Sequence, residues 1–203
     1  EKLPSGTTIL GQTQSDEKRE SLAKWIKKKG KNEAERVKSE AAARGSAMHS
    51  IIEHHVNGNN ILDMTETGQG AHRMAAVIID KGFKDLDEIW GSEVVISYPG
   101  LYAGQTDLCG IYQGRESIID FKQSNKPKKA EWIKDYKLQM IAYAMAHNCV
   151  YGTDIDQGVI LMCTPDNFFQ KFTINGREFR ELKWEWLQRL DDYYVINKSQ
   201  SVA

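Results

Sequence analysis

Residues 104–122 limit what this chain can fold into more than any other stretch. Apolar and polar residues alternate on both sides of the short segment 113–116, whose sequence is Gln-Gly-Arg-Glu. Two alternating runs joined by a short polar segment with a glycine are typical of a β-hairpin. We therefore expect two short antiparallel strands with a tight turn between them.

The position of the turn determines which residues face one another. With residues 114–115 as a two-residue loop, Asp107 lies opposite Lys122 and Cys109 opposite Asp120. Opposed residues share a face of the sheet, and so do residues two apart on one strand. Asp107, Asp120 and Lys122 are therefore expected on one face, unless a single-residue bulge turns Asp107 away.

Two acids and a lysine on one sheet face indicate a hydrolytic site with a hard metal ion. Carboxylates on neighbouring strands can close on one Mg²⁺ or Mn²⁺, and the backbone carbonyl of Phe121 could add a ligand. Lys122 could orient the attacking water or stabilise a phosphorane, and it could act as a base only if its pKa falls. The alternative is an exposed edge hairpin that carries these residues on its surface.

Composition indicates one compact domain. The chain has 203 residues, of which 40% are apolar and 27% charged, as is ordinary for a globular protein. No apolar run approaches the roughly 20 residues of a membrane span. Cys109, Cys149 and Cys163 lie far apart among apolar neighbours, and we expect reduced, buried thiols. The chain starts at Glu1 instead of Met, so we expect a processed or engineered end, where a targeting peptide would be invisible.

Positive charge is concentrated in two segments, although the formal net charge is −1. Residues 17–38 hold nine Lys or Arg against four Glu, and residues 122–137 hold six Lys against two acids. A solvated helix face would explain either run. The second run is of more interest because it begins at the candidate metal site.

Apolar periodicity predicts an order of helices, three strands, a helix, two strands and a final helix. By residue range, we expect an extended segment at 3–10, helices at 15–30, 32–55 and 70–82, a strand at 93–98 before the hairpin, a helix at 128–147, strands at 159–163 and 168–174, and a helix at 177–197. Together these form a single domain over 1–203, divided into a helical part at 1–65, a catalytic sheet and helix at 88–175 and a closing helix at 177–203.

Glu93 begins the strand before the hairpin, and its partner depends on the intervening turn. A two-residue loop pairs Glu93 with Thr106, whereas a three-residue loop pairs it with Asp107. The sequence leaves open whether Glu93 joins the acidic face.

Two helices carry further candidate residues. His49 lies at the margin of an apolar stripe, and Ser50 after it excludes the H-E-x-x-H zinc pattern. An imidazole there would favour Mn²⁺ or help to hold a second ion. On the later helix, Gln139 and Tyr143 are one turn apart and share a face.

Several motifs, which follow one another along the chain in the order of a known family, carry a resemblance to it; they include Leu-Pro-Ser-Gly-Thr-Thr-Ile-Leu at 3–10 and the basic helix around Trp25. Asp107 followed by Asp-Phe-Lys at 120–122 resembles the D…(D/E)xK signature of the PD-(D/E)XK nuclease superfamily. The pair Gln139 and Tyr143 resembles the QxxxY motif of its RecB-like branch, and Arg-Gly-Ser-Ala-Met-His at 44–49 resembles the upstream helix with a metal-binding histidine. The chain is also similar to mitochondrial and phage-encoded exonucleases of that branch, from about residue 3 to Tyr143.

Two positions depart from the family pattern. Thr106 precedes Asp107 where the signature has proline, and Gly6 stands where a β-branched residue is expected.

The resemblance implies an α/β (α+β) fold with a restriction-endonuclease-like central mixed β-sheet flanked by helices and an N-terminal helical region. It implies Mg²⁺- or Mn²⁺-dependent exonucleolytic cleavage of single-stranded DNA in replication, repair or recombination. The roles it assigns are metal binding by His49, Asp107, Asp120 and the Phe121 carbonyl, catalysis by Asp107, Asp120 and Lys122, and strand positioning by Gln139 and Tyr143.

Basic and aromatic side chains near these motifs are expected to contact DNA. The candidates for phosphate contact are Lys126, Lys128, Lys129 and either Arg44 or the basic run at 27–31. Trp25, Trp132 and Tyr136 could stack on bases, with burial in the core as the alternative.

The expected partner is DNA, preferably single-stranded, with the chain acting as a monomer away from membranes. We expect it in a bacterial or phage-infected cytoplasm, with the mitochondrial matrix as the alternative. Two other functions remain open: a flap or structure-specific endonuclease of the same superfamily, and a nucleic-acid-binding module that has lost catalysis.

Overall fold

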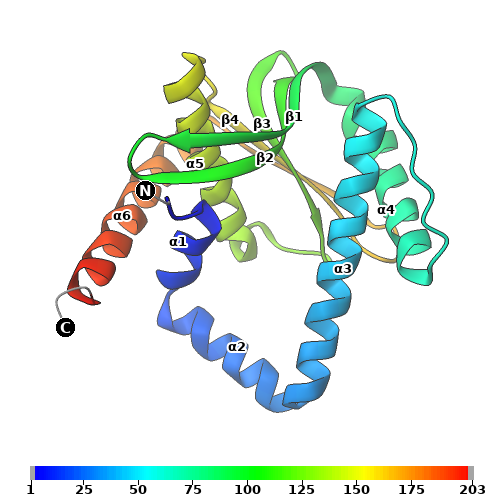
Figure 1. Ribbon diagram of the computed structural model, residues 1–203, viewed down its shortest axis with the longest axis horizontal. Helices are drawn as coiled ribbons and strands as arrows, with labels where there is room; N and C mark the ends of the chain where they lie inside the picture. The colour runs from blue at the N-terminus through cyan, green and yellow to red at the C-terminus, as the bar shows by residue number, and fades with distance from the viewer. Residues whose placement is uncertain (1–2, 201–203) are drawn as a thin grey trace.

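The computed structural model describes residues 3–200, with only the backbone of 199 and 200, as a five-stranded sheet flanked by helices (Figure 1). The strands are β1 Leu86–Tyr98, β2 Tyr102–Tyr112, β3 Arg115–Gln123, β4 Gln157–Cys163 and β5 Phe169–Ile174. The helices are α1 Gly6–Gln12, α2 Asp16–Lys29, α3 Lys31–Val56, α4 Glu66–Gly82, α5 Lys134–Tyr151 and α6 Gly176–Gln200, with 3-10 turns η1 Phe83–Asp85 and η2 Ala130–Ile133.

The sheet is mixed. Its strands lie in the order of the chain, and every neighbouring pair is antiparallel except β3 and β4. Two parallel neighbours need a long crossover connection, and α5 provides it. The predicted mixed sheet with flanking helices and an N-terminal helical region is therefore confirmed.

Two hydrophobic cores lie on opposite faces of the sheet. Helices α3 and α4 cover one face, where Ile52 and Ile78 are fully buried against Leu108 and Leu161. Helices α1, α5 and α6 cover the other face, where Trp186 is fully buried. Leu182 and Leu190 of α6 are also buried there.

The hairpin turn lies one residue earlier than predicted. Tyr112 pairs with Arg115, so the loop is Gln113-Gly114, and Cys109 pairs with Ile118 instead of Asp120. Both loop residues have positive φ, 51° for Gln113 and 73° for Gly114, as a type I′ turn requires. The predicted loop would have required Arg115, instead of Gln113, to adopt the second left-handed position.

This shift changes the partner of Asp107 but not its face. The last ladder pair of β2 and β3 is Leu108 with Ile119. One residue further along each strand, Asp107 lies opposite Asp120. The predicted partner was Lys122. The shift moves each residue's partner by two positions, and side chains alternate with a period of two. Asp107, Asp120 and Lys122 therefore still share a face.

The turn between β1 and β2 resolves the position of Glu93. Tyr98 pairs with Tyr102, so the loop has three residues, and Ser92 and Val94 pair with Leu108 and Thr106. Glu93 therefore lies opposite Asp107. It also has a φ of 53°, a left-handed conformation that is rare for a residue with a side chain.

The N-terminal segment is helical where we expected an extended or turn-rich one. Ser5 has extended backbone and its side chain accepts a hydrogen bond from the Thr8 backbone N–H, which caps α1 from Gly6 onward. A β-carbon at Gly6 would meet Tyr143, Trp186 and Ala142 only at ordinary contact distances. Leu3 and Pro4 remain extended, and the Pro4 carbonyl accepts a hydrogen bond from the Ala103 N–H.

Three other predictions need correction. Helix α4 begins at Glu66 instead of residue 70, because the Thr65 side chain caps it by accepting from the Gly68 N–H. The helix predicted from residue 128 begins at Lys134, so Trp132 lies in the 3-10 turn before α5, and at 61% exposed it does not fit the alternative of burial in the core. Cys109 and Cys163 are buried as predicted, but Cys149 is exposed near the end of α5.

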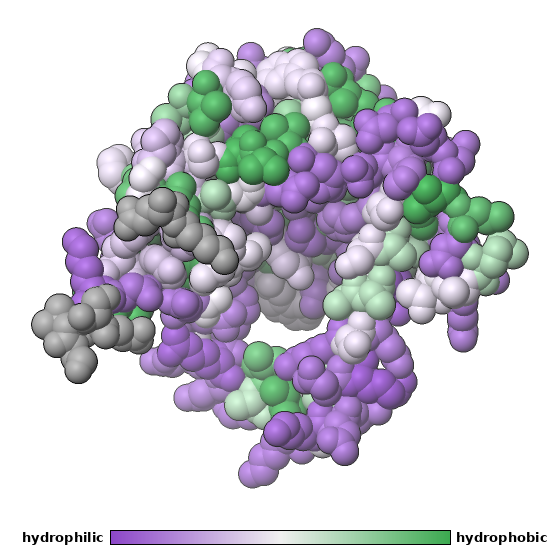
Figure 2. Space-filling model, in the orientation of Figure 1, coloured by the Kyte–Doolittle hydropathy of each residue, from purple (hydrophilic) through white to green (hydrophobic). Residues whose placement is uncertain are grey.

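Helices α2 and the first half of α3 form an arch below the rest of the molecule (Figure 1). The space-filling view shows a hollow between this mostly hydrophilic arch and the sheet domain (Figure 2). No residue of α2 is buried, and an ion pair from Lys18 to Asp135 connects it to α5. The arch is therefore a polar structure beside an opening and not part of either core.

Gly104 on β2 is required by the packing of Tyr143. A β-carbon at Gly104 would lie 2.3 Å from Tyr143 Cε1, so Gly104→Ala should destabilise the fold by about 1 to 3 kcal/mol through overpacking. Denaturant unfolding measures this. Gly11→Ala is the matched control, because no atom lies within 4 Å of the position that its new methyl carbon would take, and the change favours helix. Equal stability of both variants would contradict the packing argument.

Candidate active site

The candidate site lies where β2 and β3 separate. The last ladder pair is Leu108 with Ile119, and beyond it Asp107 Oδ2 accepts a hydrogen bond of 2.6 Å from the Phe121 backbone N–H. The Asp107 side chain thus takes the place of the β2 backbone carbonyl that would accept from the Phe121 N–H if the ladder continued. The N–H and C=O of one strand residue point to the same neighbour, so the Phe121 carbonyl is directed toward this opening as well.

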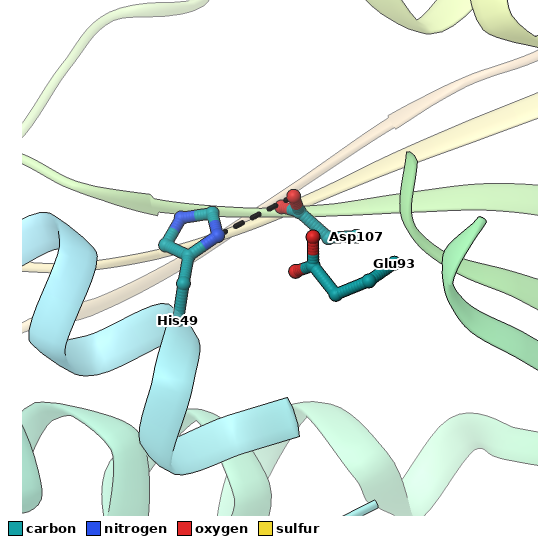
Figure 3. Close-up of side chains that lie close together, drawn as sticks. All are labelled: His49, Glu93 and Asp107. Carbon is teal, nitrogen blue, oxygen red and sulfur yellow. Dashed lines mark ion pairs between the residues drawn. The ribbon is translucent and has the colours of Figure 1, made fainter. Parts of the chain in front are cut away.

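Three side chains from three elements meet here (Figure 3). Asp107 Oδ1 lies 3.3 Å from His49 Nδ1, which projects from α3. The Glu93 carboxylate approaches from β1, and one ligand atom from each of His49, Glu93 and Asp107 lies within 4.8 Å of the others. This is a mixed nitrogen and oxygen donor set of the kind that binds a divalent cation.

Asp120 and Lys122 form a second, more deeply buried pair on β3. Asp120 is 1% exposed, and its Oδ2 lies 2.5 Å from Lys122 Nζ. The contact is an ion pair, because among the described residues no donor reaches that oxygen with hydrogen-bond geometry. Burial of this carboxylate oxygen would be costly by itself, and the Lys122 ammonium offsets the cost.

The electrostatics join these residues into one site. Burial raises the pKa of Asp120, opposed by Lys122 and reinforced by the negative charge of Asp107. Burial would raise the pKa of Asp107 too, but His49, Lys122 and the Phe121 N–H outweigh it and hold that pKa below its usual value. Lys122 is buried, yet the two acids keep its pKa above the ordinary value. The charged form of Lys122 is therefore favoured by both acids, which suits a role in stabilising negative charge or orienting water better than a role as a base.

Burial and Asp107 act in opposite directions on His49. Burial disfavours its charged form, and the hydrogen bond and charge of Asp107 overcome this and raise the pKa of the imidazole. The pKa of Glu93 is raised by burial and then by the charge of Asp107. The Asp107 carboxylate thus raises the pKa of both His49 and Glu93.

Gln139 and Tyr143 lie side by side on α5, as their spacing predicts. Gln139 Nε2 donates to Tyr143 Oη over 2.9 Å. Burial raises the pKa of Tyr143, and the charges of Asp120, Lys122 and Asp107 also act on this phenol. The pair therefore borders the acidic site from the α5 side of the sheet.

Arg44 is fixed beside the loop that follows β3. Its guanidinium donates to Gln123 Oε1 from Nε at 3.2 Å and from Nη2 at 3.1 Å, and Nη2 also contacts the side chain of Asn125. Gln123 in turn donates to the Ala41 carbonyl. Arg44 thus links α3 to the loop after β3. Two of its three guanidinium nitrogens, Nε and Nη2, already donate to Gln123 or Asn125.

A groove of about 580 Å³ lies between the arch and the loop that follows β3. It is lined by Trp25 and Lys29 of α2, Val37 of α3, Gln123 at the end of β3, residues 124–126 and Lys128 of the loop, and Tyr136 of α5. Lys122 Nζ lies 5.5 Å from the centre of the Tyr136 ring, so one residue of the groove lining is a neighbour of the candidate catalytic lysine. Lys129 is outside this lining and lies over Trp132, 5.3 Å from the ring centre.

The donors fit a hard divalent ion. Carboxylate and carbonyl oxygens with one imidazole suit Mg²⁺ or Mn²⁺, and the open oxygen of Asp120 adds a buried acceptor. Sequence reasoning had not placed Glu93 in this set. The signal that could have found it was the Pro99-Gly100-Leu101 turn, which sets the register of β1.

Comparison with known proteins relates this chain to exonucleases. No protein-family model matches the chain. Over 210 residues it is 26% identical to human Mitochondrial genome maintenance exonuclease 1, covering 98% of this chain and 60% of that protein. The mouse protein of the same name is 27% identical over 212 residues, covering 98% and 61%. The chain is a distant homologue of mitochondrial genome maintenance exonuclease 1. It spans about three fifths of the length of these relatives.

One solved structure shares the fold. A crystal structure of a candidate exonuclease from Eubacterium rectale superposes with a TM-score of 0.52 at 13% identity, covering 76% of this chain and 68% of that one. At this identity the likeness concerns the fold alone, and it supports the PD-(D/E)XK-like architecture of this exonuclease homologue. None of its helices within residues 3–200 is long and apolar enough to cross a membrane.

Proposed function

We propose that this chain is a metal-dependent DNA exonuclease that hydrolyses single-stranded DNA from free ends, in DNA replication, repair or recombination. The observation that carries the proposal is the convergence of Asp107, Asp120 and Lys122 at the open end of the β2 and β3 ladder, with His49 within 3.3 Å of Asp107. Homology to exonucleases supports the reaction class. We also propose that residues 1–203 act as one nuclease domain.

The proposed ligands are Asp107, Asp120, the Phe121 carbonyl and His49. A bound Mg²⁺ or Mn²⁺ would lower the pKa of a water nucleophile and offset negative charge on the phosphate. Lys122 is held as a cation by both acids, so its role is to stabilise the charge that develops on the phosphate and to orient the nucleophile. The Phe121 N–H holds Asp107 in place through a 2.6 Å hydrogen bond.

The groove beneath the arch is the proposed path of the strand. Lys126 and Lys128 line it and would contact phosphates, while Trp25 and Tyr136 offer faces for bases. Lys129 and Arg44 would add further phosphate contacts beside Lys126 and Lys128. Gln139 and Tyr143, which are hydrogen-bonded to each other, would position the nucleotide next to the site. An opening closed on one side by α2 and α3 suits a single strand with an end better than a duplex (Figure 2).

Trp25→Ala tests the path. Loss of one stacking face should weaken binding of a single-stranded oligonucleotide by about 1 to 3 kcal/mol, measured by fluorescence anisotropy in Ca²⁺ or without metal. Trp184→Ala is the matched control, since Trp184 lies on α6, is 72% exposed and does not line the groove. Unchanged affinity for Trp25→Ala, or an equal loss for both variants, would place the strand elsewhere.

Linear and circular single strands of the same sequence test the need for a free end. The proposal predicts complete digestion of the linear strand and protection of the circle in Mg²⁺ or Mn²⁺. Efficient cutting of the circle, or preference for a flap junction, would instead indicate the structure-specific endonuclease. Binding without cleavage of any substrate would indicate a non-catalytic module.

A further inference from the structure

The loop between β3 and η2, residues 124–129, carries the lysines that the proposed function places against the DNA backbone. It has no regular secondary structure, and Lys126 is exposed while Lys128 is partly exposed. A loop that moved freely would lose conformational entropy when DNA bound, and that loss would lower the affinity. Groups that hold this loop in place can therefore strengthen DNA binding without touching the DNA.

A glutamine side chain on another strand holds the backbone of the loop at Lys128. Gln170 Oε1 accepts a hydrogen bond of 2.7 Å from the Lys128 N–H, and Gln170 Nε2 donates to the Lys128 carbonyl over 2.8 Å. Gln170 is half-buried on β5, which is an edge strand of the sheet. Its amide therefore pairs with Lys128 as a neighbouring strand would, through one donor and one acceptor.

Gln170 lies in the same row of the sheet as the candidate catalytic lysine. Met162 of β4 pairs with Lys122 on β3 and with Gln170 on β5. Paired residues share a face of the sheet, and neighbouring strands are about 4.8 Å apart, so the backbones of Lys122 and Gln170 are about 10 Å apart. The loop thus leaves the sheet close to Lys122 and is held again two strands away, on the same face.

Other contacts fix the first half of the loop. Ser124 is buried, its backbone N–H donates to the Cys163 carbonyl over 3.1 Å, and its hydroxyl donates to the Lys126 carbonyl over 2.7 Å. Pro127 restricts the backbone between the two groove lysines. Ser124 therefore holds the loop on the β4 side, and Gln170 holds it where it approaches η2.

We propose that Gln170 is a positioning residue for DNA binding, which holds the loop so that Lys126 and Lys128 line the groove before a strand arrives. The inference rests on the proposed function and adds to it a residue that carries no charge and is outside the groove lining. Because Gln170 acts through the two lysines, it affects the affinity for single-stranded DNA and not the chemical step.

Gln170→Met tests the inference, because methionine keeps the length of the side chain and removes both hydrogen bonds. The Kd for a single-stranded oligonucleotide and the KM for its cleavage should rise about 5- to 30-fold, which corresponds to the entropy of ordering about one residue. The value of kcat should stay within about twofold of wild type, because Lys122 and the acidic site are unchanged. Gln69→Met is the matched control: Gln69 donates to the Met64 carbonyl in the loop before α4, which has no lysine and does not line the groove.

Two further measurements separate positioning from a general loss of stability. In a chain that carries Lys126→Met and Lys128→Met, adding Gln170→Met should not raise the Kd further, because the contacts that it positions are already gone. Hydrogen exchange should show a protected Lys128 amide in the wild-type chain. Gln170→Met should lose this protection while the amides of β4 and β5 keep theirs.

An affinity loss no larger than that of Gln69→Met would overturn the inference, as would an undiminished loss in the chain without the two lysines. A Lys128 amide that exchanges rapidly in the wild-type chain would also overturn it, and this measurement holds even where Gln170→Met does not fold. If the wild-type chain cleaves DNA and Gln170→Met binds DNA equally well, the inference alone fails. A wild-type chain that neither binds nor cleaves single-stranded DNA would remove the proposed function as well.

Discussion

Lys122→Met is expected to reduce the rate of DNA cleavage by about 100- to 1,000-fold, the typical effect of removing one preorganised group that stabilises a transition state. Lys122 Nζ lies 2.5 Å from Asp120, and the two acids keep it charged. Methionine retains most of the stem and removes only the ammonium. Affinity for single-stranded DNA should change much less than the rate, because in the proposed function the phosphates would be contacted mainly by the lysines of the neighbouring loop.

The stability of this variant has to be measured beside its rate. Removing one partner of a buried ion pair leaves the other charge uncompensated, so the Asp120 carboxyl should take up a proton and unfolding should become easier. Lys183→Met is the matched control: Lys183 is an exposed lysine on α6 that does not line the groove. Near wild-type turnover for Lys122→Met, under conditions where it is folded, would exclude Lys122 from the mechanism.

Asp107→Asn is expected to abolish both metal binding and cleavage, which makes it the most damaging single change to the site. Its carboxylate is the one group that contacts both the β3 side, through the Phe121 N–H, and His49. An amide keeps the size and can still accept from Phe121 through its oxygen, but it is a poor ligand for a hard cation. Calorimetry with Mn²⁺ should show loss of metal binding.

Two comparisons make the Asp107→Asn result interpretable. Thermal unfolding without metal should show a modest loss of stability, because the amide loses the attraction of His49 and Lys122 for the Asp107 charge, and relief of the repulsion with Asp120 and Glu93 offsets only part of that loss. Asp166→Asn, a change of the same kind in the loop between β4 and β5, should leave metal binding intact. Full Mn²⁺ binding by Asp107→Asn would move the metal site away from this hairpin.

The hairpin shows which part of the fold follows from local sequence. Alternation predicted the face on which Asp107, Asp120 and Lys122 lie, and that face survived an error of one residue in the loop because side-chain direction repeats every two residues. The error itself arose from turn chemistry: Gln113 adopts a positive φ that its side chain does not favour. The alternation of polar and apolar residues therefore predicted which side chains share a face, but it did not predict the two residues of the turn.

Other features depend on contacts that no local pattern contains. The hydrogen bond from the Phe121 N–H to Asp107 exists because the ladder ends one pair earlier, and Glu93 reaches the site because a three-residue loop sets the register of β1. The helix at Gly6 required recognition of Ser5 as its cap. His49 could be assigned only through a family resemblance, since nothing in its helix predicts that it meets Asp107, on a distant strand, at 3.3 Å.

The most direct test of the central claim is release of nucleotides from an end-labelled single-stranded DNA by the purified chain, in Mg²⁺ or Mn²⁺ and in a chelator. We expect progressive shortening from an end with either ion, none with the chelator, and none with Asp107→Asn in any condition. DNA that is bound but remains intact with both ions would contradict the proposed nuclease activity.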